Sequence, residues 1–567
     1  MLRFRSRSRS RSSVIAQTLY RHFFRRFFDN DTLSPQGDTE KTIARALCFC
    51  AVPGLMVAFW LLPCYPNRPE WAIVADRYFF VLYSFVTMGI VTTFEWEMLF
   101  PDRADFLILL PLPLKSRQLF ITKAKALIAF LALFLVSSNI FALVFFSAVS
   151  TGRFSSYFHT VAAHSAAVLC AGLFAAGCML AIEGLCITLL PDAWQRWISA
   201  ILQALVVTLL LLLFLLFPLF GAHMQTLLEG HASFTRFIPP LWFLGLYEQL
   251  AAGKAAPAGA QPLATLGLYA TAVSFVLALA TYPLAWVRQK KRALEGASRS
   301  RRPAGTSLAH LLHHTLLRRP QERAIFHFTS QTIRRNQHYQ VYLAIYSGVG
   351  LSLALASVLT LQRSTQHLLT LAISPRGLHA VLPLLLFWLA VGLRVAFGFP
   401  IDMRARWVFP MNMLRASGSG RATASWVLIC CWLLTAAMLC VLFALGWGAG
   451  QLLQQAVWGT ALSLLLADVL FSESSRIPFT YPRLPGRATL PMTLVLYAAA
   501  FPVFVLLTVS LELAAEAQPS ILARVLLGIA AVHILLKVKA RYMQPDTPTN
   551  FSNEESDDEF LTLGLTS

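Results

Sequence analysis

The chain has 567 residues, of which 57% are hydrophobic and only 13% are charged. Soluble domains carry about 25% charged residues, so this composition excludes an ordinary soluble protein and is typical of a membrane protein. The formal net charge of +20 would favour nucleic-acid binding in a soluble protein. Here the arginines and lysines gather at the N-terminus and in a few loops, as expected of the cytoplasmic side of a membrane protein. We therefore expect no nucleic-acid partner.

The N-terminal segment, residues 1–43, is basic and is expected to be cytoplasmic. It contains the stretch LYRHFFRRFF (19–28), whose aromatic residues occupy one half of a helical wheel and whose basic residues occupy the other. This pattern predicts an amphipathic helix in the membrane interface, with its arginines toward anionic lipid head groups. The residues that define this interfacial helix are Arg21, Phe23, Phe24, Arg25 and Phe27.

Two groups of apolar segments follow, in residues 44–287 and 341–541. Each group holds about six segments near the roughly 20 residues that a helix needs to cross a bilayer. A basic linker, residues 288–340, joins the groups and carries a second aromatic and basic stretch (324–339), which we expect to be another interfacial helix. The tail, residues 542–567, is acidic.

These segments predict an all-α polytopic membrane protein of about 12 transmembrane helices, arranged as two six-helix halves with interfacial amphipathic helices. Both termini are expected to be cytoplasmic, because that orientation puts most of the lysines and arginines inside.

The segment PDRADFLILLPLPLKSRQL (101–119) lies between the second and third apolar segments. Its apolar core is about 11 residues long, so it is too short to cross a bilayer as a helix. Prolines interrupt it, and charged residues flank it on both sides. An exposed apolar surface of this kind usually marks an interface. The segment either folds back onto the membrane protein or docks on another protein.

Three charged residues lie inside predicted membrane helices: Glu183, Arg394 and Asp468. A charge at the centre of such a helix costs about 3 kcal/mol. All three lie toward the predicted inner end of their helix, where a long side chain can reach the interface at little cost. The alternative interpretation is a relay for protons or other ions, which would indicate a transporter driven by an ion gradient.

Common catalytic and phosphate-binding motifs are absent from the sequence, which has no Gly-rich loop ending in Gly-Lys-Ser/Thr, no HExxH and no GxSxG. Its nine cysteines lie within or at the ends of apolar segments, without the spacing of a disulfide framework or a metal site. We therefore expect no catalytic residue, no metal and no cofactor.

The stretch DFLILLPLPLKSRQLFITKAKAL (105–127) resembles the loop of type-2 ABC exporter permeases, in which an acidic residue precedes LLLSLPISRRQLFLAKLL-like sequence. In that family each permease domain has an N-terminal amphipathic helix, six membrane helices and a coupling helix between the second and third. The coupling helix sits in a groove of a separate ATPase subunit. The positions that match the family motif are Asp105, Leu109, Pro111, Lys115, Arg117, Gln118, Leu119 and Lys123. Together with Leu107 and Leu110, two apolar residues of the same segment, they lead to the expected ATPase-coupling residues: Asp105, Leu107, Leu109, Leu110, Pro111, Lys115 and Arg117.

The corresponding loop of the second half, FPIDMRARWVFPMNMLRASGSGRATASW (399–426), again combines proline, acidic, arginine and aromatic residues but lacks the LP-x-S-R-Q pattern. By its position it is the second expected coupling loop, with Asp402, Arg404 and Trp407 as candidate residues. The stretch RFIPPLWFLGLYEQL (236–250) also resembles large two-half permeases of this group. The resemblance implies that it lies outside, between the fifth and sixth membrane helices, as a partly re-entrant cap.

Together these features favour the permease subunit of an ATP-driven exporter in the bacterial inner membrane. Coupling to the ATPase would use the loops between helices 2 and 3 and between helices 8 and 9. ATP would be bound and hydrolysed on the separate ATPase chain, so this chain is not expected to be an enzyme. Its other partners would be the lipid bilayer and a transported substrate that the sequence does not identify. The alternative function is a secondary transporter in which Glu183, Asp468 or Arg394 carries the coupling ion.

Overall fold

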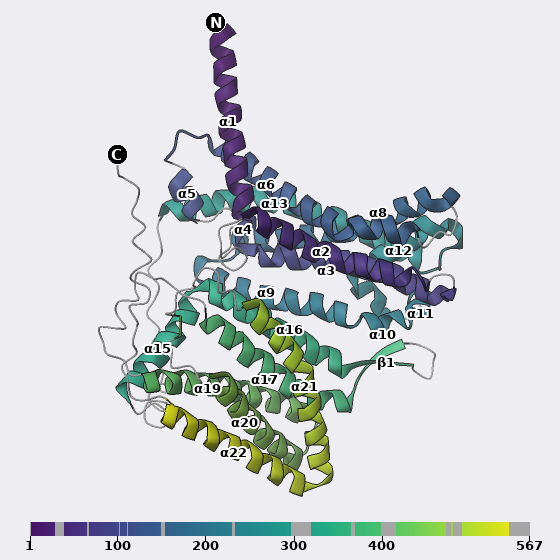
Figure 1. The fold of residues 1–567 in the computed structure, drawn as a ribbon. Helices are drawn as coiled ribbons and strands as arrows, with labels where there is room; N and C mark the ends of the chain where they lie inside the picture. Colours follow the sequence, from purple (N-terminus) through teal and green to yellow (C-terminus); the bar gives the residue numbers. More distant parts are fainter. Residues whose placement is uncertain are drawn as a thin grey trace. The chain divides into compact units, whose positions relative to one another are not determined.

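The computed structural model describes most of the chain, and nearly all of the described part is helical (Figure 1). The described residues are 2–28, 39–64, 67–100, 103–109, 111–148, 154–229, 233–295, 319–363, 369–398, 416–471, 478–479 and 490–543. Among them, 11 helices are long and apolar enough to cross a membrane. The protein is therefore an all-α polytopic membrane protein, which confirms the predicted fold class.

The chain divides into two compact units. Unit 1 comprises Met1–Arg301 and Leu359–Ile373, and unit 2 comprises Arg302–Val358 and Ser374–Ser567. The first six of the 11 membrane-crossing helices belong to unit 1 and the other five to unit 2. Unit 2 holds in addition a shorter apolar helical stretch, Tyr342–Val358.

Unit 1 is centred on α3 and α8, which pack on each other and on several of the other helices. Its helices, in chain order, are α1 (Leu2–Arg26), α2 (Thr39–Leu61), α3 (Glu70–Phe94), α4 (Trp96–Leu99), α5 (Arg103–Leu109), α6 (Ser116–Phe141), the π-helical η2 (Ala142–Phe146), α8 (Phe154–Leu189), α9 (Asp192–Leu215), α10 (Phe217–Gly221), α11 (Met224–Leu228), the 3₁₀-helical η3 (Ser233–Phe237), α12 (Pro239–Ala252), the 3₁₀-helical η4 (Gly253–Ala255) and α13 (Ala260–Glu295).

A two-stranded antiparallel hairpin also belongs to unit 1 by its contacts. It pairs β1 (Leu359–Arg363) with β2 (Leu369–Ile373), in a register that places Leu361 opposite Leu371. The sequence analysis did not predict this hairpin. The signal for it is the alternation of leucine with polar residues in LTLQR, which is the two-residue period of a strand.

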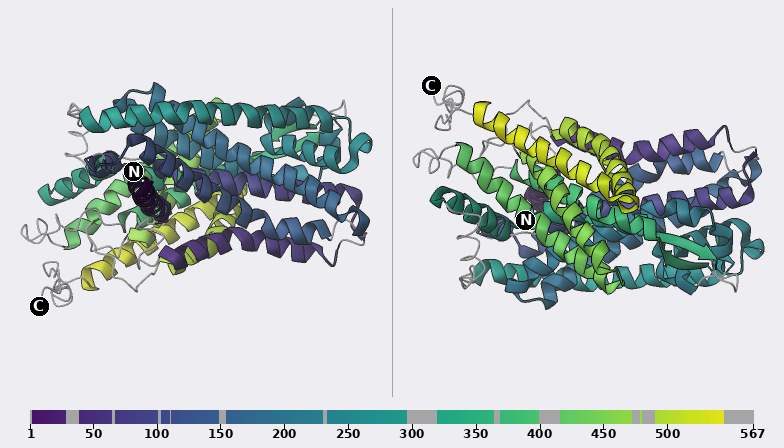
Figure 2. Two further views of the ribbon diagram at one scale, coloured as in Figure 1. Left: turned by 90° about the horizontal axis from the view of Figure 1, so that it is seen from above. Right: turned by 90° about the horizontal axis from the view of Figure 1, so that it is seen from below.

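Helices α8 and α13 run side by side (Figure 2), and small residues set their separation. A Cβ at Gly184 of α8 would lie 2.4 Å from Oγ1 of Thr281, and a Cβ at Gly177 would lie 2.9 Å from Oγ of Ser274. Both neighbours belong to α13. Membrane helices associate through close packing of this kind, because lipid tails leave little hydrophobic driving force between them.

Unit 2 is centred on α17, which packs on α16, α19, α20 and α21. Its helices are α15 (Pro320–Arg335), α16 (Gln337–Val358), α17 (Pro375–Phe397), α19 (Ala416–Ala444), α20 (Ala449–Phe471), α21 (Leu490–Ala517) and α22 (Pro519–Met543). Most of the stretch expected to be a second interfacial helix lies in α15, which ends where Asn336 adopts an extended conformation.

Prolines mark where several helices of both units begin. Helices α12, α15, α17 and α22 each start at a proline, whose fixed φ and missing N–H suit the first turn of a helix. At α17 the preceding residue adds a cap, because the Ser374 hydroxyl accepts a hydrogen bond from the Gly377 N–H at 3.3 Å.

Replacing Gly184 by leucine should lower the thermal midpoint of the detergent-purified protein, because the new side chain would overlap Thr281 and push α13 away from α8. Overpacking of this kind costs about 1–3 kcal/mol. Gly528→Leu is the matched control, since Gly528 lies in the membrane-crossing helix α22 and a Cβ there would meet nothing within 4 Å. Equal midpoints for the two variants in differential scanning fluorimetry would contradict close packing of α8 on α13.

Candidate functional site

The short helix α5 lies in the loop between the membrane helices α3 and α6, where the sequence motif predicts a coupling helix (Figure 1). Its two sides differ in exposure. Asp105 and Phe106 are buried, whereas Leu107 is 52% exposed and Ile108 is 68% exposed. One side of α5 is therefore packed into unit 1, and the other presents apolar side chains away from it.

An ion pair joins α5 to the N-terminal helix α1. The Arg26 guanidinium donates a hydrogen bond to the Asp105 carboxylate. The Asp105 side chain is almost completely buried, and a buried carboxylate that loses its cation is strongly destabilising. Asp105, predicted as an ATPase-coupling residue, thus positions α5 within the protein.

Aromatic packing joins both α5 and α6 to α13. The Phe106 ring meets the Trp286 ring of α13 edge-on, with the ring centres 5.3 Å apart. Phe120 of α6 makes a similar edge contact with the same Trp286 ring at 5.2 Å. Aromatic pairs in this geometry contribute about 0.5–1.5 kcal/mol beyond the burial of their surface. α5 is therefore attached to α1 by a charge pair and to α13 by a ring contact.

The interfacial helix predicted from LYRHFFRRFF packs on the start of α6. Its Phe23 and Phe27 side chains are buried. The buried Lys123 ammonium of α6 lies 5.2 Å from the centre of the Phe23 ring and 4.8 Å from that of the Phe27 ring, and a cation is attracted to the negative face of an aromatic ring. The other predicted residues of this helix are less buried: Arg21, Phe24 and Arg25.

The remaining predicted coupling residues lie at the end of α5, follow it in the chain, or fall outside the described residues. Leu109 is half-buried, and three others are exposed: Pro111, Lys115 and Arg117. The Lys115 backbone N–H donates to the Gln118 side-chain oxygen at 3.4 Å in the first turn of α6. Four predicted residues lie outside the described residues: Leu110, Asp402, Arg404 and Trp407.

The three charged residues predicted inside membrane helices lie in three different helices. Glu183 is buried in α8. The Arg394 guanidinium of α17 lies 5.8 Å from the centre of the Phe471 ring. The Asp468 carboxylate of α20 pairs with Nδ1 of His533 of α22. The Asp468 contact thus pairs a carboxylate with an imidazole.

Unit 1 contains a buried ion pair that the sequence analysis missed. Nη1 of Arg77, on α3, lies 2.9 Å from both carboxylate oxygens of Glu248, on α12. The Arg77 guanidinium also lies 5.1 Å from the centre of the Tyr247 ring. Burial raises the pKa of Tyr247 to about 12, so its phenol stays neutral beside the pair. The signal in the sequence was a lone acid within the apolar stretch that forms α12.

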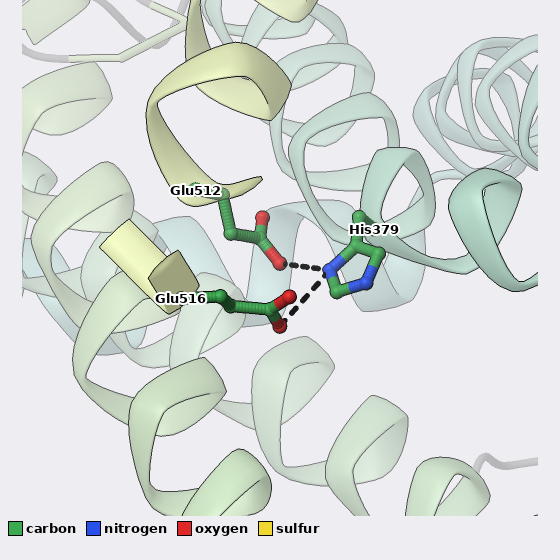
Figure 3. Close-up of side chains that lie close together, drawn as sticks. All are labelled: His379, Glu512 and Glu516. Carbon is green, nitrogen blue, oxygen red and sulfur yellow. Dashed lines mark hydrogen bonds and ion pairs between the residues drawn. The ribbon is translucent and has the colours of Figure 1, made fainter. Parts of the chain in front are cut away.

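A second missed cluster lies in unit 2, where His379, Glu512 and Glu516 converge (Figure 3). Nδ1 of His379, on α17, lies 2.6 Å from Oε1 of Glu512 and 3.7 Å from Oε1 of Glu516. Both acids belong to α21. Two acids four residues apart in an apolar helix share one face, and this spacing is the signal that could have found them.

No protein-family model, no curated protein and no solved structure matches the chain. Its function therefore has to be inferred from the geometry of its own sites. The Arg77–Glu248 pair is internal, whereas α5 combines an anchored side with an exposed apolar side. Of these sites, α5 has the chemistry best suited to a partner protein.

Replacing Arg26 by alanine should speed amide hydrogen exchange in α5, because the buried Asp105 carboxylate loses this cation. A loss of about 1.4 kcal/mol of local stability corresponds to tenfold faster exchange, and losing one partner of a buried pair commonly costs more. Hydrogen exchange followed by mass spectrometry measures the effect. Arg25→Ala is the matched control, since Arg25 is exposed on the same helix. Unchanged exchange in the Arg26 variant would show that the ion pair does not hold α5.

Replacing either Arg77 or Glu248 by leucine should lower the thermal midpoint, and replacing both should recover most of the loss. Removing one partner of a buried pair costs about 3–5 kcal/mol, whereas replacing both by apolar residues is often neutral. Thermal unfolding of the two single variants and the double variant completes a double-mutant cycle. A double variant whose loss equals the sum of the single losses would rule out coupling between α3 and α12 through this pair.

Proposed function

We propose that this multi-pass membrane protein is the permease subunit of an ATP-driven exporter, and that α5 is its coupling helix. The observation that carries the proposal is the difference between the buried side of α5, with Asp105 and Phe106, and its exposed side, with Leu107 and Ile108. The helix is too short to cross a bilayer, so contact with lipid along a membrane helix does not account for this exposure. An anchored apolar surface suits the groove of a separate ATPase subunit.

In this proposal α5 transmits movement from the ATPase to the membrane helices. Closure of the ATPase around ATP would push on the exposed side of α5. The Arg26–Asp105 pair would pass the displacement to α1, and the Phe106–Trp286 contact would pass it to α13. ATP shifts the permease only if the ATPase binds its two conformations with different free energies. The permease therefore needs differential contacts, and the hydrolysis of ATP belongs to the partner chain.

The proposal places α5 and both termini on the cytoplasmic side of a bacterial inner membrane, where ATP is available. The concentration of lysines and arginines in the segments assigned to that side supports this orientation. The exposed Arg21 and Arg25 side chains would then contact anionic lipid head groups. The loop 399–426 of the second half is proposed as a second coupling site, with Asp402, Arg404 and Trp407.

A second candidate function is a transporter driven by an ion gradient, and the contact between Asp468 and His533 favours it. A carboxylate and an imidazole that meet between membrane helices can exchange a proton. Glu183 and Arg394 are the other charged residues of membrane helices that such a transporter would use. This function requires no ATPase, so the two candidates differ in whether α5 has a partner.

Purification of the tagged chain from its native membrane in mild detergent should bring a P-loop ATPase with it, identified by mass spectrometry. Replacing Leu107 and Ile108 together by aspartate should remove the ATPase, because each new charge would be buried without a partner in the interface. These two residues are better targets than Leu109, which is half-buried.

Phe237→Asp is the control for the double substitution. Phe237 is 84% exposed and lies outside the membrane-crossing helices of unit 1, so this variant should keep the ATPase. Retention of the ATPase by the α5 double variant would exclude docking through α5. If no ATPase co-purifies in several mild detergents, the gradient-driven function predicts proton uptake into reconstituted vesicles that Asp468→Asn abolishes.

A further inference from the structure

We propose that unit 2 contains a binding site for a divalent transition-metal ion, formed by His379, Glu512 and Glu516. One ligand atom from each of these residues lies within 4.8 Å of the others, and Figure 3 shows the three side chains pointing toward a common point. Gln455 contributes a polar side chain from α20. The site lies near the start of α17, the start of α20 and the end of α21. It is independent of any role of α5.

The charges of this cluster do not balance when both acids are ionised and no cation is bound. Glu512 and Glu516 are one helical turn apart on α21, so two ionised carboxylates there would repel each other. The single imidazole of His379 carries at most one positive charge, which leaves the cluster negative when both acids are ionised. A divalent cation with a neutral imidazole makes the group neutral. Neutrality is strongly favoured for polar groups buried between membrane helices.

Two buried oxygens of the cluster have no hydrogen-bond donor among the described residues, namely Oε2 of Glu512 and Oε1 of Gln455. The two residues are only 2% and 3% exposed. Gln455 already faces the cluster, because its Nε2 donates a hydrogen bond to Glu512 Oε1. Buried polar atoms in folded proteins nearly always have a partner. The free lone pairs of a carboxylate and an amide oxygen are what a bound cation would take up.

Glu248, a buried acid of unit 1, shows a different arrangement. Glu248 meets the Arg77 guanidinium, which carries a fixed positive charge and lies 2.9 Å from both carboxylate oxygens. Glu512 instead shares one imidazole with a second acid. The cluster of unit 2 thus has more acceptors than donors. This excess distinguishes a candidate metal site from an ordinary ion pair.

The donor atoms favour a first-row transition ion such as Zn²⁺ or Mn²⁺. Imidazole nitrogen suits such ions, whereas Ca²⁺ and Mg²⁺ take oxygen ligands. Atoms bound to one tetrahedral Zn²⁺ lie roughly 3.3 Å apart, since each lies about 2.0–2.2 Å from the metal. The separations of 2.6 Å and 3.7 Å between His379 Nδ1 and the two carboxylates bracket this value. Small side-chain rotations would therefore complete the site.

Glu516 is the ligand that solvent can reach, because its side chain is 34% exposed. It lies next to the end of α21, where a hydrated ion can exchange its water for protein ligands. The bound ion would join α17 to α21 through His379 and Glu512, which are 133 residues apart in the chain. We therefore expect the ion to stabilise the folded protein.

The test uses the whole chain, purified in detergent, treated with a chelator and then titrated with ZnCl₂ while thermal unfolding is followed by fluorescence. Zn²⁺ should raise the midpoint by about 3 °C or more. Glu516→Gln should abolish this increase. Because the Glu516 side chain is partly exposed, we expect this variant to fold. His533→Gln is the matched control, because it removes another histidine of unit 2 that pairs with an acid. This control should keep the Zn²⁺ effect.

Zinc-edge X-ray absorption provides a second measurement on the same sample. It should show nitrogen and oxygen ligands without sulfur, which separates this site from binding by the cysteines. A variant with three linker histidines replaced by asparagine should also keep the Zn²⁺ effect: His310, His313 and His314.

Three results would overturn the proposal. The first is no increase in the midpoint of the wild-type chain, and the second is an increase that survives both Glu516→Gln and His379→Gln. The third is an increase with Ca²⁺ or Mg²⁺ but not with Zn²⁺, which would exclude a transition-metal site.

Discussion

A charge buried in a membrane protein has to find its partner within the protein, because neither the packed protein interior nor the bilayer offers it water. In the described chain this requirement decides which helices are joined to one another. Three ion pairs among the described residues each link two different helices: Arg26–Asp105, Arg77–Glu248 and Asp468–His533. Breaking such a pair leaves a buried charge uncompensated, so each pair restricts the position of its helices more strongly than apolar contact with neighbours alone.

The same requirement bears on the proposed role of α5 as a coupling helix. A helix of 7 residues is unstable in isolation, so neighbouring helices have to hold it in place. Asp105 and Phe106 provide this attachment, which leaves Leu107 and Ile108 free to meet a partner. Because closely packed side chains compress little, a force on the exposed side would reach α1 and α13. In the proposed exporter the attachment of α5 to α1 and α13 is thus as necessary as its exposed surface. A helix without this attachment would not transmit the movement of the ATPase to the membrane helices.

The fold class could be predicted because a membrane helix is marked by about 20 consecutive apolar residues. The α5 loop could be selected because a short, proline-broken apolar run stands out among longer ones. The partner of Asp105 could not be predicted, since Arg26 lies 79 residues away and an ion pair leaves no periodic pattern. The pair between Arg77 and Glu248, 171 residues apart, was missed for the same reason. The hairpin was missed because strands of 5 residues merge with the apolar end of the preceding helix.

Within unit 2 the need of a buried charge for a partner is met in two different ways. Asp468 and His533 match one acid to one base in a single contact. At His379 a single base faces two acids, and Gln455 adds another acceptor oxygen. The excess of acceptor atoms around Glu512 supports the proposed cation site, just as the exposed apolar side of α5 supports the proposed protein partner. In both proposals the chemistry of the residues defines the class of partner: acceptor atoms suit a cation, and exposed apolar side chains suit a protein.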